Sequence, residues 1–344
     1  MTGGSGRWSR YRPFLCAVGP SARPNHSPTH PVSLKTESVL TDTNRISGLA
    51  RPPGVPPGKW SNPTMYAFVH IEKTGGTTIN QILRRSFGTR HCDVRLPLAK
   101  RGHEDFDHRT PIDAADLRRV QRVYRQLKCI GGHNVKAYSA LAAACPDIEF
   151  FTVLRDPAAR FRSHFLNRAD GHTPAHFDRW GSAAWVQNWQ TKMIAGEPNG
   201  EKAIELLAAR FGFVGLTERF DESLVLLGSW MGEPSFRAEY RRQNQLRDKQ
   251  RPRDVARQQI DMSYLDSDSA RARIAEANAE DQKVYDFVTQ TIYPRQVTAH
   301  PGNLASDVDA LRQRNRAIEK FREPLPSSLF RNYVYKPLLH CYVC

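Results

Sequence analysis

The chain has 344 residues, of which 40% are hydrophobic and 10% aromatic, so it is long and apolar enough to form a sizeable core. Its formal net charge of +15 at pH 7 favours an anionic ligand or partner, although a surface charged only for solubility would have the same composition. The sequence contains no recognised nucleic-acid motif and no apolar run of about 18 residues. We therefore expect no nucleic-acid partner and no membrane span.

Residues 1–64 are rich in Gly, Ser, Pro and Arg and show no apolar periodicity, which predicts a disordered N-terminal extension. Met65 stands directly before the first apolar segment, so a second interpretation is that residues 1–64 lie upstream of the true start. The apolar piece Phe14–Val18 is too short for a signal-peptide core, and the six cysteines form no disulfide framework. These features predict a cytoplasmic location.

The stretch from Tyr66 to Asn80, YAFVHIEKTGGTTIN, has the pattern of a phosphate-binding loop. Its first residues are aromatic and β-branched, which predicts a buried strand. Gly75 and Gly76 let the backbone turn tightly and approach an anion, and a helix predicted from Thr77 to Ser86 would direct its first N–H groups at that anion. The side chains that would assist are Lys73, Thr74, Thr77 and Thr78.

The order of residues in this loop differs from that of nucleoside-triphosphate enzymes. Their motif, GxxxxGK[ST], places a lysine after the glycines and beside a hydroxyl that binds magnesium. Lys73 precedes the glycine pair, and no lysine follows it in the loop. A P-loop kinase or nucleotide hydrolase is therefore the less favoured interpretation.

The next segments lead to a second candidate site. Residues 88–111 are polar, and the spacing of the histidines in this segment matches no zinc motif, so we predict a surface loop. Residues 112–126 predict a helix. A short strand, Lys128–Ile130, then ends in two glycines that would let the chain turn and place His133 over the carboxyl edge of the sheet. The alternative is that His133 caps a helix over residues 135–144.

A second apolar strand, predicted from Ile148 to Leu154, runs into the sequence RDPAARFRSHF. Asp156 followed by Pro157 predicts a helix start, with the aspartate as N-cap and the proline at the first helical position. Arg155 would then stand at the carboxyl end of a strand, where ligands bind in open α/β sheets, with Ser163 two turns into the helix.

These two motifs, in this order and each after a strand, resemble those of the sulfotransferases that use 3′-phosphoadenosine 5′-phosphosulfate (PAPS). The resemblance covers residues 66–290 and is sharpest at 70–80, 130–138 and 148–165. It implies a P-loop-type three-layer α/β fold, with a central, mostly parallel sheet flanked by helices, over residues 65–295. Residues 296–344 would be a C-terminal polar segment and aromatic tail.

The resemblance also implies roles for the site residues. The loop Lys73-Thr74-Gly75-Gly76-Thr77-Thr78 would bind the 5′-phosphosulfate, with Lys73 stabilising the leaving phosphate, and Arg155 with Ser163 would bind the 3′-phosphate. A Gly-His at this point is similar to the heparan and chondroitin uronyl 2-O-sulfotransferases, which implies that His133 is the general base. The implied acceptor is a hydroxyl of an anionic or neutral carbohydrate, with a lipid or small metabolite left open, and no metal is required.

Downstream, the pattern predicts a helical stretch over residues 180–195, in which Trp185 and Trp189 share a core-facing side, and one amphipathic helix over residues 270–292. Further helices are expected over 201–210 and 221–231, with a strand over 213–216 between them.

The run 236–257 contains eight Lys or Arg against three Asp or Glu and could line a channel for a polyanionic acceptor, although a solvated loop has the same pattern. A non-catalytic polyanion-binding protein is accordingly the alternative from another class. The C-terminal Cys341-Tyr342-Val343-Cys344 has no second ligand pair, so we expect no metal site there.

Overall fold

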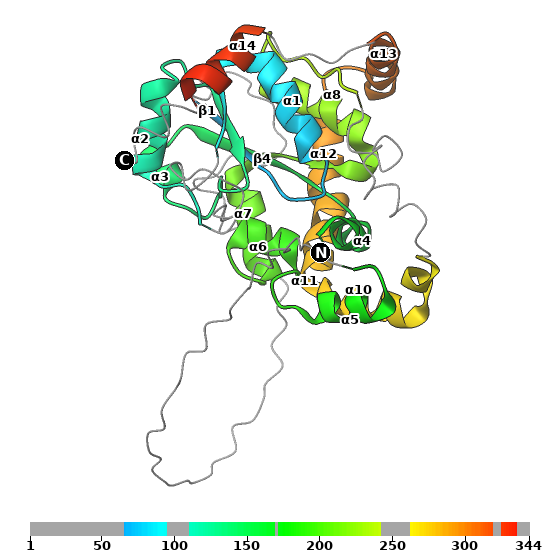
Figure 1. Cartoon of the computed structure of the whole chain (residues 1–344). Coiled ribbons are helices and arrows are strands. Elements are labelled where there is room, and N and C mark those ends of the chain that lie inside the picture. The colour runs from blue at the N-terminus through cyan, green and yellow to red at the C-terminus, as the bar shows by residue number, and fades with distance from the viewer. Residues whose placement is uncertain (1–64, 95–109, 169–170, 242–261, 319–324, 336–344) are drawn as a thin grey trace, which may run out of the picture. The chain divides into compact units, whose positions relative to one another are not determined.

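The computed structural model describes residues 65–94, 110–168, 171–241, 262–318 and 325–335 (Figure 1). Residues 1–64, most of the basic run 236–257 and the C-terminal pair Cys341 and Cys344 lie outside the described residues, and so do the predictions made for them. The strands are β1 (Met65–Val69), β2 (His91–Asp93), β3 (Cys129–Gly132), β4 (Ile148–Leu154) and β5 (Phe211–Leu216). The α-helices are α1 (Gly76–Phe87), α2 (Ala114–Val123), α3 (Leu141–Ala144), α4 (Pro157–Arg168), α5 (Pro174–Ser182), α6 (Trp189–Ala195), α7 (Gly200–Arg210), α8 (Phe220–Met231), α10 (Asp268–Ala277), α11 (Ala279–Phe287), α12 (Tyr293–Thr298), α13 (Leu304–Arg316) and α14 (Leu325–Leu329).

The five strands form one sheet in the order β2-β3-β1-β4-β5, and each neighbouring pair is parallel. All side chains of β1 and β5 are buried. Because successive side chains of a strand point to opposite faces, both faces of the sheet must be covered. The structure therefore confirms the predicted α/β fold, a central parallel sheet flanked by helices (Figure 1).

Strand β1 lies at the centre of the sheet and sets the position of the site. The chain places β2 and β3 on one side of it and β4 and β5 on the other. In open α/β sheets, ligands bind beyond the carboxyl ends of the strands at such a point. His70 follows β1, His133 follows β3 and Arg155 follows β4, so all three stand at this edge.

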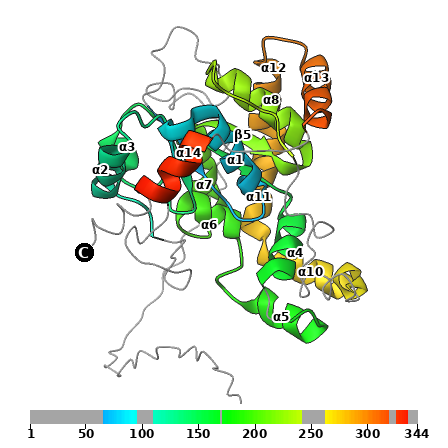
Figure 2. The same ribbon diagram turned by 45° about the horizontal axis from the view of Figure 1, so that its top comes forward.

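Two apolar clusters hold the described part together. The main core packs the sheet against helices that include α1, α7 and α8, and it also contains Leu311 of α13 and Tyr335 after α14. A second cluster joins α4, α5 and α10, which lie together in Figures 1 and 2. The domain boundary predicted at residue 295 stays a prediction, although residues on both sides of it share the main core.

Strand β3 continues through both glycines, where a turn was predicted from the sequence. A Cβ atom on Gly132 would collide with the carbonyl oxygen of Val94, and one on Gly131 would come within 2.9 Å of the Asn80 side chain. The two glycines thus allow neighbouring segments to pack closely against β3. Strand β2, which pairs His91 with Cys129, was not predicted, because three residues are too few to show an alternating pattern.

The helix expected over residues 135–144 is wrong for most of its length, since only Leu141–Ala144 are helical. The hydroxyl of Ser139 donates to the carbonyl oxygen of Lys136 at 2.7 Å and accepts from the N–H of Leu141 at 3.4 Å. A side chain that bonds to its local backbone in this way competes with the helix. His133 therefore does not cap a helix over this stretch.

Two longer helices that the sequence predicted are interrupted in the structure. Trp189 is 6% exposed and belongs to the core as expected, but Trp185 is 41% exposed and lies between α5 and α6. The predicted 270–292 helix is divided at Asn278, whose side-chain N–H donates to the carbonyl oxygen of Ile274 at 2.7 Å. The backbone φ of Asn278, −129°, is outside the helical range, so α10 ends and α11 begins there.

Candidate active site

The loop after β1 has the backbone shape of an anion cradle. Lys73 and Gly75 both adopt left-handed conformations, with φ of 69° and 85°. Gly76 begins α1 with its Cα against the imidazole ring of His70, where a Cβ atom would collide with that ring. Only glycine fits at Gly76, and left-handed residues before a helix turn successive N–H groups toward the same side.

The start of α1 is available to an anion. The N-cap of α1 is Gly75, which has no side chain that could cap the helix. The N–H of Thr78 donates to the carbonyl oxygen of Gly75 at 2.9 Å. The first N–H groups of a helix lack partners within the helix, and the helix dipole makes them attractive to negative charge. Thr77 is exposed at this end, whereas Thr78 is buried, with 8% of its surface exposed. Binding of a phosphate by either side chain stays a prediction.

The side chain of Thr74 is bonded within the loop. It is fully buried, and its hydroxyl donates to the carbonyl oxygen of Ile71 at 3.0 Å. Its own carbonyl oxygen accepts a hydrogen bond from the Thr217 hydroxyl at 3.0 Å. In this structure the side chain of Thr74 holds the loop in shape, and only its backbone N–H is a candidate phosphate donor.

His133 stands beside His70 at the ends of two paired strands. Val69 is in register with Gly132, so the residues that follow them are neighbours. The two imidazole rings are stacked, with their centroids 4.1 Å apart, and His133 Nδ1 lies 2.8 Å from the carbonyl oxygen of His70. A carbonyl oxygen only accepts, so Nδ1 carries the proton and the lone pair of the neutral ring is on Nε2.

Arg155 is fixed at the end of β4 by its backbone and by its side chain. Gln190 makes two hydrogen bonds to its backbone, accepting from the N–H at 2.9 Å and donating to the carbonyl oxygen at 2.8 Å. The Arg155 guanidinium donates to the carbonyl oxygen of Lys73 at 3.2 Å. The structure thus brings the end of β4 and the anion cradle together, as predicted.

The predicted helix start after Arg155 is confirmed. Pro157 is the first residue of α4, and Asp156 Oδ1 accepts a hydrogen bond from the N–H of Ala159 at 2.8 Å. Ser163 lies two turns into this helix and is half-buried. Its binding of a 3′-phosphate stays a prediction.

Sequence reasoning missed two residues that shape this site. His70 packs between Phe68, His133 and Gly76, and the side-chain nitrogen of Asn80 lies 3.4 Å from its Nδ1. Thr217 bonds to the loop through Thr74 and lies 2.9 Å from the carbonyl oxygen of Leu154. A histidine placed directly after a central strand was the available signal for His70. Nothing in the sequence paired Thr217 with the loop.

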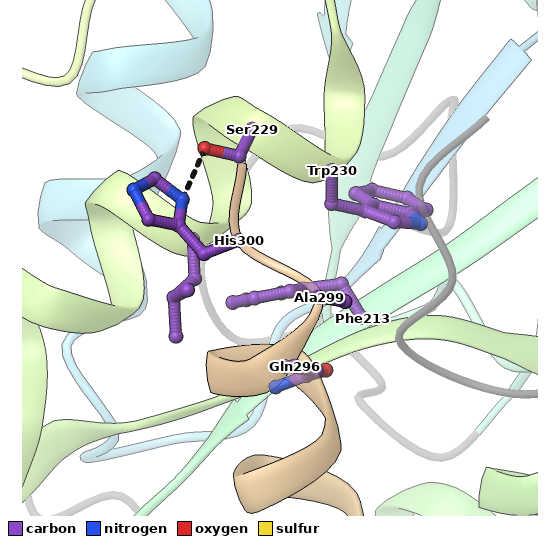
Figure 3. Close-up of a pocket in the computed structure, with 7 residues that line it drawn as sticks. Phe213, Ser229, Trp230, Gln296, Ala299 and His300 are labelled. Atoms are coloured by element: carbon purple, nitrogen blue, oxygen red, sulfur yellow. Dashed lines mark hydrogen bonds between the residues drawn. The ribbon is translucent and has the colours of Figure 1, made fainter. Parts of the chain in front are cut away.

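A serine, a histidine and an aspartate meet elsewhere in the fold. Ser229 Oγ lies 2.9 Å from His300 Nδ1, beside a small pocket lined by Trp230 and Phe213 (Figure 3). His300 Nε2 lies 2.8 Å from Asp307 Oδ2. Nucleophilic hydrolases use these residue types, but they also need N–H donors for an oxyanion. Ser229 lies inside α8, where the helix uses these donors, so we regard the contacts as a structural link from α8 to α13.

The described residues contain no cluster of three or more His, Cys, Asp or Glu side chains placed to hold a metal ion. In the same part of the chain, no helix combines the length and apolar character that a membrane crossing requires.

The fold and the loop together define an α/β protein with an anion cradle at the carboxyl edge of its sheet. No protein-family model matches the chain. The chain is similar to human galactosylceramide sulfotransferase, with 29% identity over 244 residues that cover 62% of this chain and 52% of that protein. It therefore spans about half the length of this curated relative. The similarity supports a sulfotransferase family but does not single out the uronyl 2-O branch.

Proposed function

We propose that this chain transfers a sulfuryl group from PAPS to a hydroxyl of a carbohydrate acceptor. The observation that carries the proposal is the hydrogen bond from His133 Nδ1 to the carbonyl oxygen of His70, 2.8 Å long. It leaves the basic nitrogen on Nε2, in a ring that stands at the same sheet edge as Lys73 and Arg155. A base beside an anion cradle suits the transfer of an anionic group to a hydroxyl.

The residues at this edge fit a donor with two phosphate positions. A glycine N-cap at α1, which leaves the helix start without a cap from that residue's side chain, is a feature of a loop that receives a phosphate. Lys73 and the N–H groups of residues 74–78 would hold the 5′-phosphosulfate, and Arg155 with Ser163 would hold the 3′-phosphate. When bound, the donor supplies an activated sulfuryl group.

The chain's own contribution would be positioning and charge. Negative charge grows on the leaving phosphate during such a transfer, and Lys73 would stabilise it. His133 Nε2 would accept the proton of the attacking hydroxyl. Arg155 would provide selectivity, because a nucleotide without a 3′-phosphate leaves that guanidinium without its ligand.

The similarity to a galactosylceramide sulfotransferase favours a galactosyl hydroxyl as the acceptor over the uronyl hydroxyl that the Gly-His pattern suggests. The two acceptors differ in charge, since uronyl chains are polyanions. A uronyl acceptor would gain from the basic run 236–257, and its use would be weakened by salt.

The test is transfer of labelled sulfate from PAPS to galactosyl and uronyl acceptors, with and without chelator. We expect labelled product on a galactosyl acceptor, no requirement for metal, and loss of product in Lys73→Ala. Hydrolysis or transfer from ATP with Mg²⁺, but not from PAPS, would replace the proposal by the kinase alternative. Heparin binding without turnover of either donor would support the polyanion-binding alternative.

A further inference from the structure

A buried chain of polar contacts joins α4 to the anion cradle. Arg160 donates from a terminal guanidinium nitrogen, Nη1, to His164 Nδ1 at 3.2 Å. On the other side of the ring, His164 Nε2 lies 3.1 Å from Glu72 Oε2. Arg160 and His164 are almost completely buried, and Glu72 is the residue directly before Lys73. Neither Glu72 nor His164 has a role predicted from the sequence.

The contacts determine where the proton of His164 lies. An arginine has no acceptor atom, so Arg160 must donate and His164 Nδ1 must accept. The proton of the neutral ring is then on Nε2, the nitrogen whose distance from Glu72 Oε2 is 3.1 Å. Burial lowers the pKa of Arg160 to about 10, which still leaves it charged at neutral pH.

The ring cannot easily turn away from these partners. Three tryptophan rings lie around it, with centroids 5.2 to 5.8 Å from that of His164: Trp180, Trp185 and Trp189. The indoles come from α5, α6 and the segment between them. His164 is therefore held in one orientation, with its donor nitrogen toward Glu72.

Glu72 is an unexpected residue beside an anion-binding loop. A carboxylate turned into the cradle would repel a phosphosulfate, because both groups carry negative charge. In the structure, the carboxylate points to His164 instead. Lys73, the next residue, has a left-handed backbone and accepts a hydrogen bond from Arg155 through its carbonyl oxygen. The orientation of Glu72 thus bears directly on the loop.

We propose that His164 is a positioning residue that holds the carboxylate of Glu72 out of the anion cradle and fixes the loop that carries Lys73. This inference deepens the proposed function and rests on it. Arg160 orients His164, and the tryptophan rings keep it in place. His164 itself would contact neither the donor nor the acceptor.

The experiment compares variants of the full chain by calorimetric binding of adenosine 3′,5′-bisphosphate. In His164→Leu the carboxylate is released, and we expect binding to weaken by about tenfold or more. His164→Gln has a donor and an acceptor that could replace the two ring nitrogens, so it should bind nearly as the wild type does. Glu72→Gln in the His164→Leu background removes the repulsive charge and should restore most of the affinity.

The matched control is His300→Leu. His300 is also buried and paired with an aspartate, but it lies at the small pocket beside α8, away from the cradle. We expect it to lower the thermal midpoint without changing bisphosphate affinity. A role of His164 in stability alone predicts that the Glu72→Gln double variant binds no better than His164→Leu, and that result would overturn the proposal. So would wild-type affinity in His164→Leu.

Hydrogen–deuterium exchange of residues 73–78 provides a readout that needs no ligand. If His164 fixes the loop, exchange there should be faster in His164→Leu and unchanged in His300→Leu. Equal exchange in wild type and His164→Leu would contradict the proposal. Wild-type protein that does not bind the bisphosphate would refute the proposed function instead, and the exchange result would still decide the role of His164 in the loop.

If His164→Leu does not fold, Glu72→Gln alone replaces it. This variant keeps an oxygen that can accept from His164 Nε2, and it should bind the bisphosphate as tightly as the wild type. Weaker binding would show that the charge of Glu72 assists the site, contrary to the proposal.

Discussion

His133 Nδ1 donates to the backbone carbonyl oxygen of His70 across 2.8 Å, and the two rings are stacked. Adjacent parallel strands bring the residues together, because Val69 and Gly132 are in register. A backbone acceptor cannot rotate away as a side chain can, so the hydrogen bond sets both the tautomer and the direction of Nε2. The proposed base is thus oriented by the sheet itself.

Replacing His133 should lower the rate and leave donor binding unchanged. General-base catalysis typically contributes about 10²- to 10⁴-fold, and we expect a loss of that size in His133→Ala. His133→Gln is the matched variant, since an amide can still donate to the His70 carbonyl but cannot act as the base, and its loss should be similar. Rate and bisphosphate affinity are measured for both. A rate close to wild type in either variant would exclude His133 as the base.

Substitutions of Thr74 and Thr77 should have different effects, the first on stability and the second on PAPS binding. Thr74→Val removes the buried hydrogen bond to Ile71 and should lower the free energy of unfolding by about 1 to 2 kcal/mol. Thr77→Ala changes an exposed side chain and should leave stability unchanged while weakening PAPS binding. Denaturant unfolding and calorimetry measure the two quantities. Unchanged stability in Thr74→Val, or lower stability with unchanged PAPS binding in Thr77→Ala, would contradict these assignments.

Gly76→Ala should disturb the base through His70. The added Cβ atom would collide with the His70 ring, which is stacked on His133. We expect kcat to fall and the thermal midpoint to decrease, because the ring must move and its Asn80 contact is lost. A Gly76→Ala enzyme with wild-type kcat would show that His70 does not fix His133.

Asp93 should make the free energy of unfolding depend on pH in the acidic range. Burial alone would raise its pKa, but the hydrogen bond from His91 and the charges of His91 and Arg84 outweigh burial and hold the pKa well below its ordinary value. The folded state then binds a proton less readily than the unfolded chain. The stabilisation is fully present above the unfolded pKa of about 4 and is lost as pH falls toward the lowered value.

Asp93→Asn is the variant that tests this. It leaves the partly buried Arg84 without its ion pair and should lower the free energy of unfolding by about 2 to 3 kcal/mol at neutral pH. The difference from wild type should shrink as pH falls below about 4. Urea unfolding at several pH values measures it, and a difference that is constant with pH would contradict the assignment.

The sequence predicted those parts of the fold that depend on local pattern. The apolar segments Tyr66–Ile71 and Ile148–Leu154 predicted strands, the first of which ends at Val69 in the structure. The Asp156-Pro157 pair predicted the start of α4, because capping acts over a few residues. Parallel strands place Lys73 and Arg155 at the same carboxyl edge of the sheet, as predicted. In the structure the Arg155 guanidinium donates to the carbonyl oxygen of Lys73.

The parts that could not be predicted depend on contacts between distant segments. The Thr217 hydroxyl donates to the carbonyl oxygen of Thr74, 143 residues away along the chain. The hydrogen bond that sets the His133 tautomer requires the register between β1 and β3. His164 and Glu72 are 92 positions apart, so only the packing of α4 beside the loop brings them together.

Selectivity for a 3′-phosphate is the most direct test of the central claim. Calorimetry compares adenosine 3′,5′-bisphosphate with AMP and ADP on wild type, Arg155→Ala and the charge-preserving Arg155→Lys. A charge-assisted hydrogen bond contributes about 1.5 to 3 kcal/mol, so we expect a preference for the bisphosphate of about 10- to 100-fold that Arg155→Ala abolishes. The preference should not require metal. Equal binding of the three nucleotides by wild type, or tight binding of ADP only with Mg²⁺, would contradict a PAPS site.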